Sequence, residues 1–213
     1  KEKRVKLIKK YVDQLFIIFP FEKEYFRKKG VSAIYEGNPL VDAVEQKLQG
    51  MPAKEEFFKS NNIPTDKPII ALLAGSRASE IKYNLPFMAE LSKRFPGHRF
   101  VLGGVPWLEK QVYDKAMGGN RDNISFVCDQ TYPLLKYADA AVVTSGTATL
   151  ETALVGTPEI VCYRRDRISM NIGRMVIKVR FISLVNLILN REAVRELIQW
   201  DMKLPKAEEE LKA

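Results

Sequence analysis

The middle of the chain contains, in this order, an apolar run, a hydroxyl-rich turn, a short helix and a second apolar run. This order constrains the fold more than any other feature of the sequence. Residues 140–143 have the pattern of a buried strand, and residues 159–163 that of a second one. A helix begins between them near Ala148. It should end at Gly156 and Pro158, because glycine just past a helix and proline soon after it are common terminators. The stretch predicts a strand–helix–strand unit.

The same alternation of strand and helix covers most of the chain. Apolar runs at residues 69–73, 99–104 and 124–128 lack the polar–apolar alternation of half-exposed strands. Such runs are typical of a parallel sheet covered by helices on both faces, and right-handed crossovers make it a Rossmann-like sandwich. The 213 residues are 46% hydrophobic and 28% charged, so the chain can bury such a core. A chain of this length can form one large domain or two small ones, and we expect a single domain over residues 1–213.

The two ends of the chain are less regular. Residues 1–10 read as a charged lead-in, and residues 169–179 as an amphipathic basic helix. Residues 181–184 read as a strand, and residues 191–199 as a helix before a charged tail. No apolar run reaches the ~18 residues of a transmembrane helix, so the sequence predicts no membrane span.

Small and polar residues follow several of the predicted strands, at the edge where ligands bind in sheets of this kind. These residues are Gly75-Ser76-Arg77, Gly103-Gly104, Ser145-Gly146-Thr147 and Asn186. The Ser145–Thr147 turn brings two hydroxyls and unpaired backbone N–H groups to a helix N-terminus, which suits a phosphate. Glu151 lies four residues past Thr147 on the same helix face, where its carboxylate could accept hydrogen bonds from the vicinal hydroxyls of a ribose.

Each of these turns also has a purely structural interpretation. Thr147 could cap its helix, and Glu151 could be favoured there by the helix dipole. Arg77 offers a forked donor for pyrophosphate, but it could equally pair with Glu80 in a tight turn. Asn186 could bind a ligand or form an Asx turn. Together, the turns favour a diphosphate nucleotide as ligand.

Tyr163, at the end of its strand, could be a core aromatic or part of a pocket wall. A single histidine, His98, argues against His-based metal sites and Ser-His-Asp catalysis. There is no Asp-x-Asp motif or carboxylate cluster for Mg²⁺, so we expect neither metal nor cofactor.

The net charge of +8 is concentrated in residues 1–10 and 164–180. Such clusters suit an anionic membrane surface or a pyrophosphate ligand, and a solvated basic face stays open as an alternative. No zinc finger, RNP aromatic motif or helix-turn-helix signature accompanies the charge, so we do not expect nucleic acid as a partner.

Five segments resemble the lipid A disaccharide synthase family in their order and spacing. They are residues 19–23 (FPFEK), 72–80 (LLAGSRASE), 145–151 (SGTATLE), 163–164 (YR) and 183–186 (SLVN). MurG-like transferases and UDP-sugar epimerases share the general layout. The resemblance implies the C-terminal, nucleotide-binding half of an inverting glycosyltransferase of GT-B fold. The N-terminal acceptor domain and the C-terminal tail would then lie outside this chain.

Members of that family join UDP-2,3-diacylglucosamine and 2,3-diacylglucosamine 1-phosphate (lipid X) into the lipid A disaccharide and release UDP. They act in the cytoplasm, peripherally on the inner face of the inner membrane, and can form homodimers. The resemblance implies catalytic roles for Arg77 and Asn186, while the general base would belong to the absent half. Substrate-binding roles are implied for Gly75, Ser76, Arg77, Ser145, Gly146, Thr147, Glu151, Tyr163 and Asn186.

From this resemblance we expect the isolated chain to bind UDP weakly without turnover. Three alternatives stay open from the sequence: an epimerase-like domain, a MurG-like domain, and a noncatalytic module that binds nucleotides or membranes.

Overall fold

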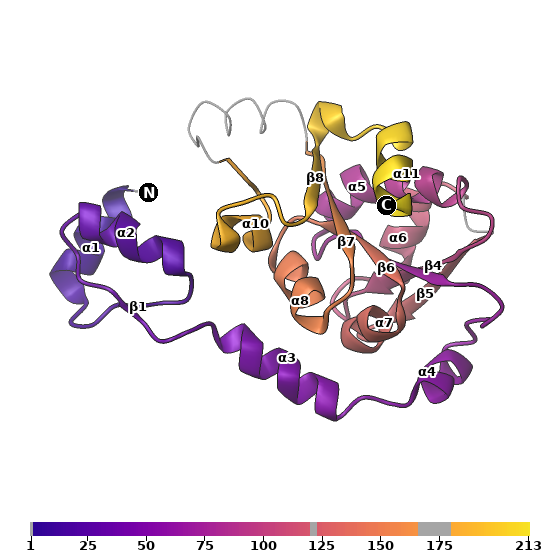
Figure 1. Cartoon of the computed structure of the whole chain (residues 1–213), viewed down its shortest axis with the longest axis horizontal. Coiled ribbons are helices and arrows are strands. Elements are labelled where there is room, and N and C mark those ends of the chain that lie inside the picture. Colours follow the sequence, from indigo (N-terminus) through magenta and orange to yellow (C-terminus); the bar gives the residue numbers. More distant parts are fainter. Residues whose placement is uncertain (1, 120–122, 166–179) are drawn as a thin grey trace. The chain divides into compact units, whose positions relative to one another are not determined.

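The structure, a computed structural model, describes residues 2–119, 123–165 and 180–213 (Figure 1). The chain forms two compact units, Lys1–Glu45 and Gln46–Ala213. The physical reason is that the first two strands form a two-stranded sheet of their own, while the other six strands form a separate sheet.

The first unit contains α1 (Glu2–Tyr11), β1 (Phe16–Ile17), α2 (Pro20–Lys28) and β2 (Ile34–Tyr35), with the two strands paired in parallel. Helix α3 (Pro39–Gln49) contains the boundary between the units. Residues 1–10, expected only as a charged lead-in, lie mostly in α1.

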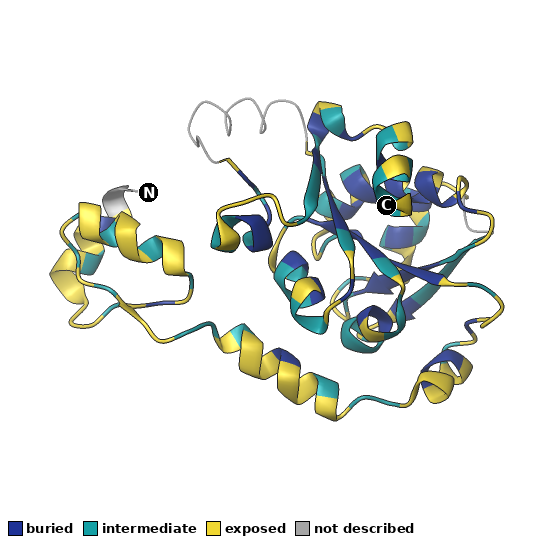
Figure 2. Ribbon diagram, viewed as in Figure 1, coloured by how far each residue is buried: buried dark blue, intermediate teal, exposed yellow. Residues whose placement is uncertain are grey.

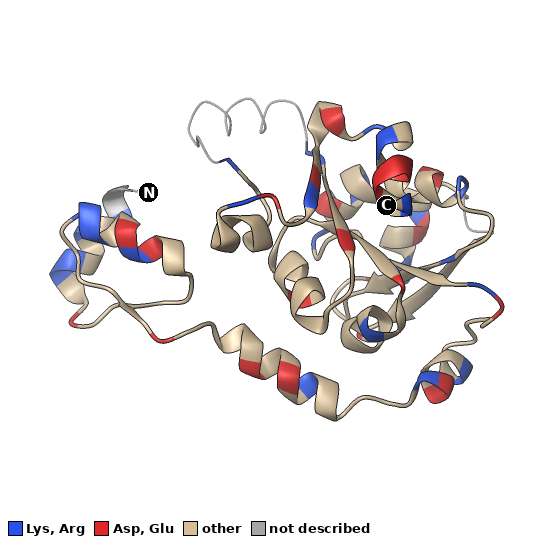
Figure 3. Ribbon diagram, viewed as in Figure 1, with Lys and Arg blue, Asp and Glu red and all other residues tan. Residues whose placement is uncertain are grey.

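Helix α1 has one apolar position in the interior of its unit and a strongly basic surface. Val5 is buried, whereas Arg4, Lys6, Lys9 and Lys10 are exposed (Figures 2 and 3). Along the described ranges of the chain, no helix is long and apolar enough to cross a bilayer.

The second unit is built on a parallel six-stranded sheet with the order β5-β4-β3-β6-β7-β8. The strands are β3 (Ile69–Leu73), β4 (Arg99–Gly104), β5 (Ile124–Cys128), β6 (Ala140–Thr144), β7 (Glu159–Tyr163) and β8 (Arg195–Ile198). The fold class predicted from the sequence, a Rossmann-like parallel sheet with helices on both faces, is confirmed.

Successive residues of each strand place their side chains on opposite faces of this sheet, as the side-chain period of a strand requires. Ile70 and Leu72 belong to a core shared with helices α5 (Ala78–Ser92), α6 (Lys110–Met117) and α11 (Leu204–Lys212). Ala71 and Leu73 belong to the opposite core, shared with α4 (Lys54–Ser60), α7 (Thr131–Tyr137) and α8 (Thr147–Val155). The sheet is therefore buried on both sides (Figure 2).

The C-terminal part departs from the sequence prediction. The helix expected over residues 191–199 was wrong: strand β8 occupies Arg195–Ile198, and a 3-10 turn (Gln199–Asp201) follows. Strand β8 pairs with β7 and buries Leu197 completely, a nonlocal contact that overrides local helix propensity.

The strand expected over residues 181–184 was also wrong. Helix α10 (Leu184–Leu189) starts there, and the Ser183 side chain caps it by accepting a hydrogen bond from the Asn186 N–H. The basic helix expected over residues 169–179 lies outside the described residues.

Candidate functional site

A cavity of about 370 Å³ lies at the carboxyl ends of β3, β4, β5 and β6 in the second unit. The loop after β3 and the loop after β6 both line it, although some 70 residues separate them. Seven of the predicted site residues are among its lining: Gly75, Ser76, Arg77, Ser145, Gly146, Thr147 and Glu151. The sheet thus brings together the two turns that the sequence analysis singled out, as the strand-end argument predicts.

The loop after β3 is held in shape by Glu80, in the first turn of α5. Its Oε2 accepts a hydrogen bond from the Ser76 N–H at 3.1 Å, and its Oε1 accepts one from Arg77 Nη1 at 2.9 Å. Gly75 has a φ of +112°, and a Cβ there would lie 2.6 Å from Cβ of Glu80. Glycine is therefore required on both conformational and steric grounds.

The Arg77–Glu80 pair that the sequence left open as an alternative is present. The pair with Glu80 does not use all the N–H donors of the guanidinium, because arginine carries five of them and the Arg77 side chain is 74% exposed. Arg77 keeps donors that face solvent at the cavity.

The loop after β6 leads into the N-terminus of α8. Gly146 holds the N-cap position and Thr147 is the first helical residue, so the alternative in which Thr147 caps this helix was wrong. Ser145 Oγ donates to the Ile182 carbonyl at 2.9 Å, which ties the loop to the segment before α10. The first N–H groups of a helix have no intrahelical acceptor, so this end of α8 offers amide donors and a positive dipole end to an anion.

A pair that sequence reasoning missed lies in the same cavity. Tyr132, near the start of α7, donates its hydroxyl to Glu151 Oε1 at 2.7 Å. Burial and the bond to Glu151 raise the pKa of Tyr132 above its usual value, so the phenol stays protonated and remains a donor. No local signal marks Tyr132, because packing of α7 against α8 creates the contact.

Two glycines and an aromatic ring shape the side of the cavity formed by β4. A Cβ on Gly104 would lie 2.5 Å from Phe126 Cζ, so the strand end leaves no room for a side chain there. Trp107, a residue that is 68% exposed, follows in the loop, and its Nε1 donates to the Ser76 carbonyl at 3.0 Å. Helix α6 begins after this loop, at Lys110.

The lining of this cavity carries more acidic than basic side chains. Among the described residues that line the cavity, Arg77 is the one cation, against Glu80, Asp129 and Glu151. An anionic ligand would therefore depend on helix amides and hydroxyls as well as on the guanidinium. No group of three or more His, Cys, Asp or Glu residues able to hold a metal occurs in the described parts of the chain.

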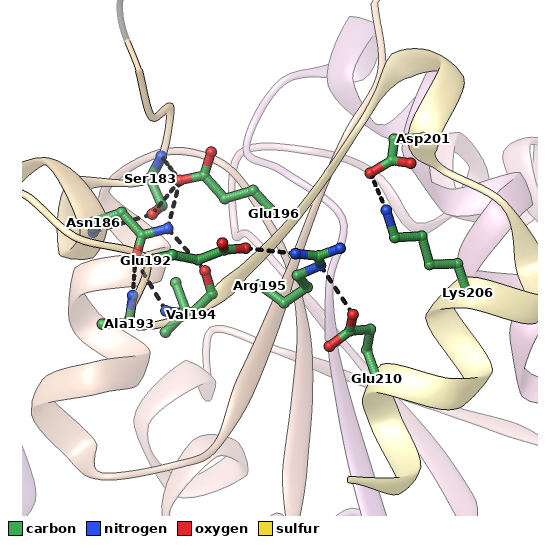
Figure 4. A network of polar contacts seen from close by, with 10 residues as sticks. All are labelled: Ser183, Asn186, Glu192, Ala193, Val194, Arg195, Glu196, Asp201, Lys206 and Glu210. Carbon is green, nitrogen blue, oxygen red and sulfur yellow. Dashed lines mark hydrogen bonds and ion pairs between the residues drawn. The ribbon is translucent and has the colours of Figure 1, made fainter.

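Two predicted site residues lie elsewhere. Tyr163, half-buried at the end of β7, is not part of the cavity lining. Asn186 was expected just after a strand, but it lies within α10 and is fully buried. Its Nδ2 donates to Glu196 Oε1 at 2.9 Å, and its Oδ1 accepts from the N–H groups of Ala193 and Val194 at 2.7 and 3.0 Å (Figure 4). Its amide is thus committed to a structural network, and its implied catalytic role stays a prediction.

Comparison with known proteins relates this chain to one protein family. Residues 1–213 match the sequence model described as lipid-A-disaccharide synthetase. The lipid-A-disaccharide synthase of Myxococcus xanthus (strain DK1622) is 37% identical over 213 residues, which cover 98% of this chain and 55% of that protein. The enzyme of Syntrophus aciditrophicus (strain SB) is 36% identical, over 92% of this chain and 51% of its own length. The chain therefore spans about half the length of these curated relatives.

Solved structures show the same fold at low sequence identity. A UDP-GlcNAc 2-epimerase from Methanocaldococcus jannaschii has a TM-score of 0.62 at 15% identity, covering 94% of this chain and 54% of that one. A glycosyltransferase from Rickettsia africae ESF-5 has a TM-score of 0.62 at 9% identity, covering 100% and 56%. The chain therefore shares its fold with about half of each of these two proteins.

Proposed function

The chain belongs to the lipid-A-disaccharide synthetase family, and from this premise we propose that its cavity holds the UDP part of a lipid-linked sugar nucleotide. One observation carries the proposal: the Gly75–Arg77 loop and the N-terminus of α8 line the same cavity, with Glu151 one helical turn further on. The guanidinium and helix amides then hold the diphosphate, and Glu151 accepts hydrogen bonds from the ribose hydroxyls.

The same groups suit the chemistry of sugar transfer. When the bond between the sugar and the diphosphate breaks, negative charge builds up on the leaving UDP. Donors fixed in place before the reaction stabilise that charge without having to reorganise. Arg77, held at its loop by Glu80, and the amides of α8 are such donors.

For the whole protein of which this chain resembles one half, we propose the family's reaction. UDP-2,3-diacylglucosamine and lipid X are joined into the lipid A disaccharide 1-phosphate, and UDP is released. A base in the other half deprotonates the acceptor hydroxyl. We place this reaction at the cytoplasmic face of the inner membrane, where the exposed Arg4, Lys6, Lys9 and Lys10 of α1 would favour anionic lipids.

Calorimetric titration of the 213-residue chain with UDP tests the nucleotide site. We expect Arg77→Ala to weaken UDP binding by about 10-fold or more, because a charge-assisted bond contributes roughly 1.5–3 kcal/mol. Arg94→Ala is the matched control: Arg94 is also a partly exposed arginine paired with a glutamate, Glu208 at 3.0 Å, and it is not part of the cavity lining. Absence of UDP binding by the wild-type chain, or equal affinity in both variants, would contradict the proposal.

A second assay tests the reaction. The longer protein with its N-terminal half restored should release UDP from UDP-2,3-diacylglucosamine only when lipid X is present. Epimerisation of the donor sugar without an acceptor would instead favour the epimerase-like alternative.

A further inference from the structure

Tyr132 and Glu151 reach the cavity from neighbouring helices and meet there. Tyr132 is the second residue of α7, Glu151 lies in the second turn of α8, and both side chains are half-buried. The 2.7 Å hydrogen bond from the phenol to Glu151 Oε1 fixes one carboxylate oxygen, and within the described parts of the chain no hydrogen bond occupies Oε2.

We propose that Tyr132 is a positioning residue, whose hydroxyl holds Glu151 in the orientation that accepts the vicinal ribose hydroxyls of the nucleotide. The inference rests on the proposed function, because it presupposes a ribose at Glu151. It adds a residue to the site for which neither the sequence motifs nor the family resemblance gives a role.

The position of Tyr132 on a well-packed helix supports this role. Leu134 and Leu135 of the same helix are completely buried against the sheet, so a packed helix rather than a loop carries the phenol. A free glutamate side chain loses up to ~2 kcal/mol of rotamer entropy when it becomes ordered. Since the bond to Tyr132 orders Glu151 before the ligand arrives, the side chain loses less entropy when the ligand binds.

The electrostatics of the pair agree with a fixed donor and a fixed acceptor. Burial, followed by the bond to Glu151, raises the pKa of Tyr132. The hydroxyl therefore keeps its proton at neutral pH. A hydrogen bond to an ionised acceptor is about twice as strong as one between neutral groups, so the arrangement persists in water.

The test compares two ligands that differ only at the ribose. Calorimetry should show that the wild-type chain binds UDP more tightly than 2′,3′-dideoxy-UDP, which lacks both hydroxyls. We expect Tyr132→Phe, which removes only the phenolic oxygen, to weaken UDP binding by about 5- to 10-fold. Binding of the dideoxy ligand should stay within about two-fold of wild type, because it never uses Glu151.

Tyr137→Phe is the matched control. Tyr137 lies on the same helix and also donates its hydroxyl at 2.7 Å, to the Pro52 carbonyl, but it is not part of the cavity lining. Loss of a merely structural hydroxyl should leave the preference for UDP over the dideoxy ligand unchanged. The ratio of the two affinities therefore separates a positioning role from a general loss of stability.

Glu151→Ala, which leaves Tyr132 in place, should abolish the same preference. In that background, a further Tyr132→Phe change should have no effect on either ligand. A preserved preference in Glu151→Ala, or equal weakening of both ligands by Tyr132→Phe, would overturn the inference while leaving UDP binding intact. Failure of the wild-type chain to bind UDP at all would instead overturn the proposed function, and this inference with it.

Discussion

Glu159 carries a carboxyl group whose burial makes ionisation unfavourable. It begins β7, at the amino end of the sheet and so at the opposite end from the cavity, where it pairs with Ala141 of β6. Both carboxylate oxygens are buried, and neither has a hydrogen-bond partner among the described residues. Burial raises the pKa of this carboxyl from 4.5 to about 8. The protein therefore holds an acid that is neutral when folded and ionised when unfolded at pH 7.

The sign of the effect on stability follows from proton binding. Below pH 4.5 both states are protonated, and the contribution of Glu159 to folding is at its most favourable. As the pH rises from 4.5 towards 8, the unfolded state loses its proton and the folded state keeps it. The free energy of unfolding then falls by about 1.4 kcal/mol per pH unit. Across this window the loss amounts to roughly 5 kcal/mol as an upper value.

Glu159→Gln tests this reasoning, because the amide has nearly the same shape and cannot ionise. Urea unfolding between pH 5 and 9 can be followed by tryptophan fluorescence, since Trp107 and Trp200 both lie in the second unit. We expect similar stabilities near pH 5, where wild-type Glu159 is protonated and as unpaired as the amide. At pH 8.5 the variant should be more stable by several kcal/mol.

The control is Glu209→Gln, which changes an exposed carboxylate of α11 and should leave the pH profile as in the wild type. Parallel pH profiles for wild type and Glu159→Gln would refute the argument, because they would mean that Glu159 ionises equally easily in both states.

Three further substitutions test the packing of the second unit. Gly104→Ala should destabilise the second unit by about 1–3 kcal/mol, because its Cβ would lie 2.5 Å from Phe126 Cζ, whereas Gly97→Ala meets open space and should change little; equal melting temperatures would contradict this. Asn186→Ala removes the acceptor of two backbone N–H groups and should lower stability by about 2–4 kcal/mol in urea unfolding, and an unchanged midpoint would show that the network in Figure 4 does not stabilise the fold. Leu85→Ala, at a completely buried position of α5, should cost about 2–5 kcal/mol, and a loss below 1 kcal/mol would mean that the core collapses around the gap.

The parts of the fold that sequence reasoning predicted correctly are those with strong local signals. The apolar runs of β3, β4, β6 and β7 mark buried parallel strands without help from the rest of the chain. The errors at α10 and β8 have the opposite origin. Residues 191–199 carry no strand pattern of their own, and only the free edge of β7 makes a strand of Arg195–Ile198. Cys128 is exposed because it ends β5, one of the two edge strands of the sheet.

By itself, the sequence determined the parallel sheet and the two polar turns at its carboxyl edge, because side-chain periodicity, glycine and proline act within a few residues. Only the tertiary structure decided which side chains meet at the cavity. The Tyr132–Glu151 bond spans 19 residues, and the Trp107–Ser76 bond spans 31. The burial of Asn186 likewise follows from the way α10 packs beside β8. Contacts of this kind depend on how whole elements pack, and no local pattern encodes them.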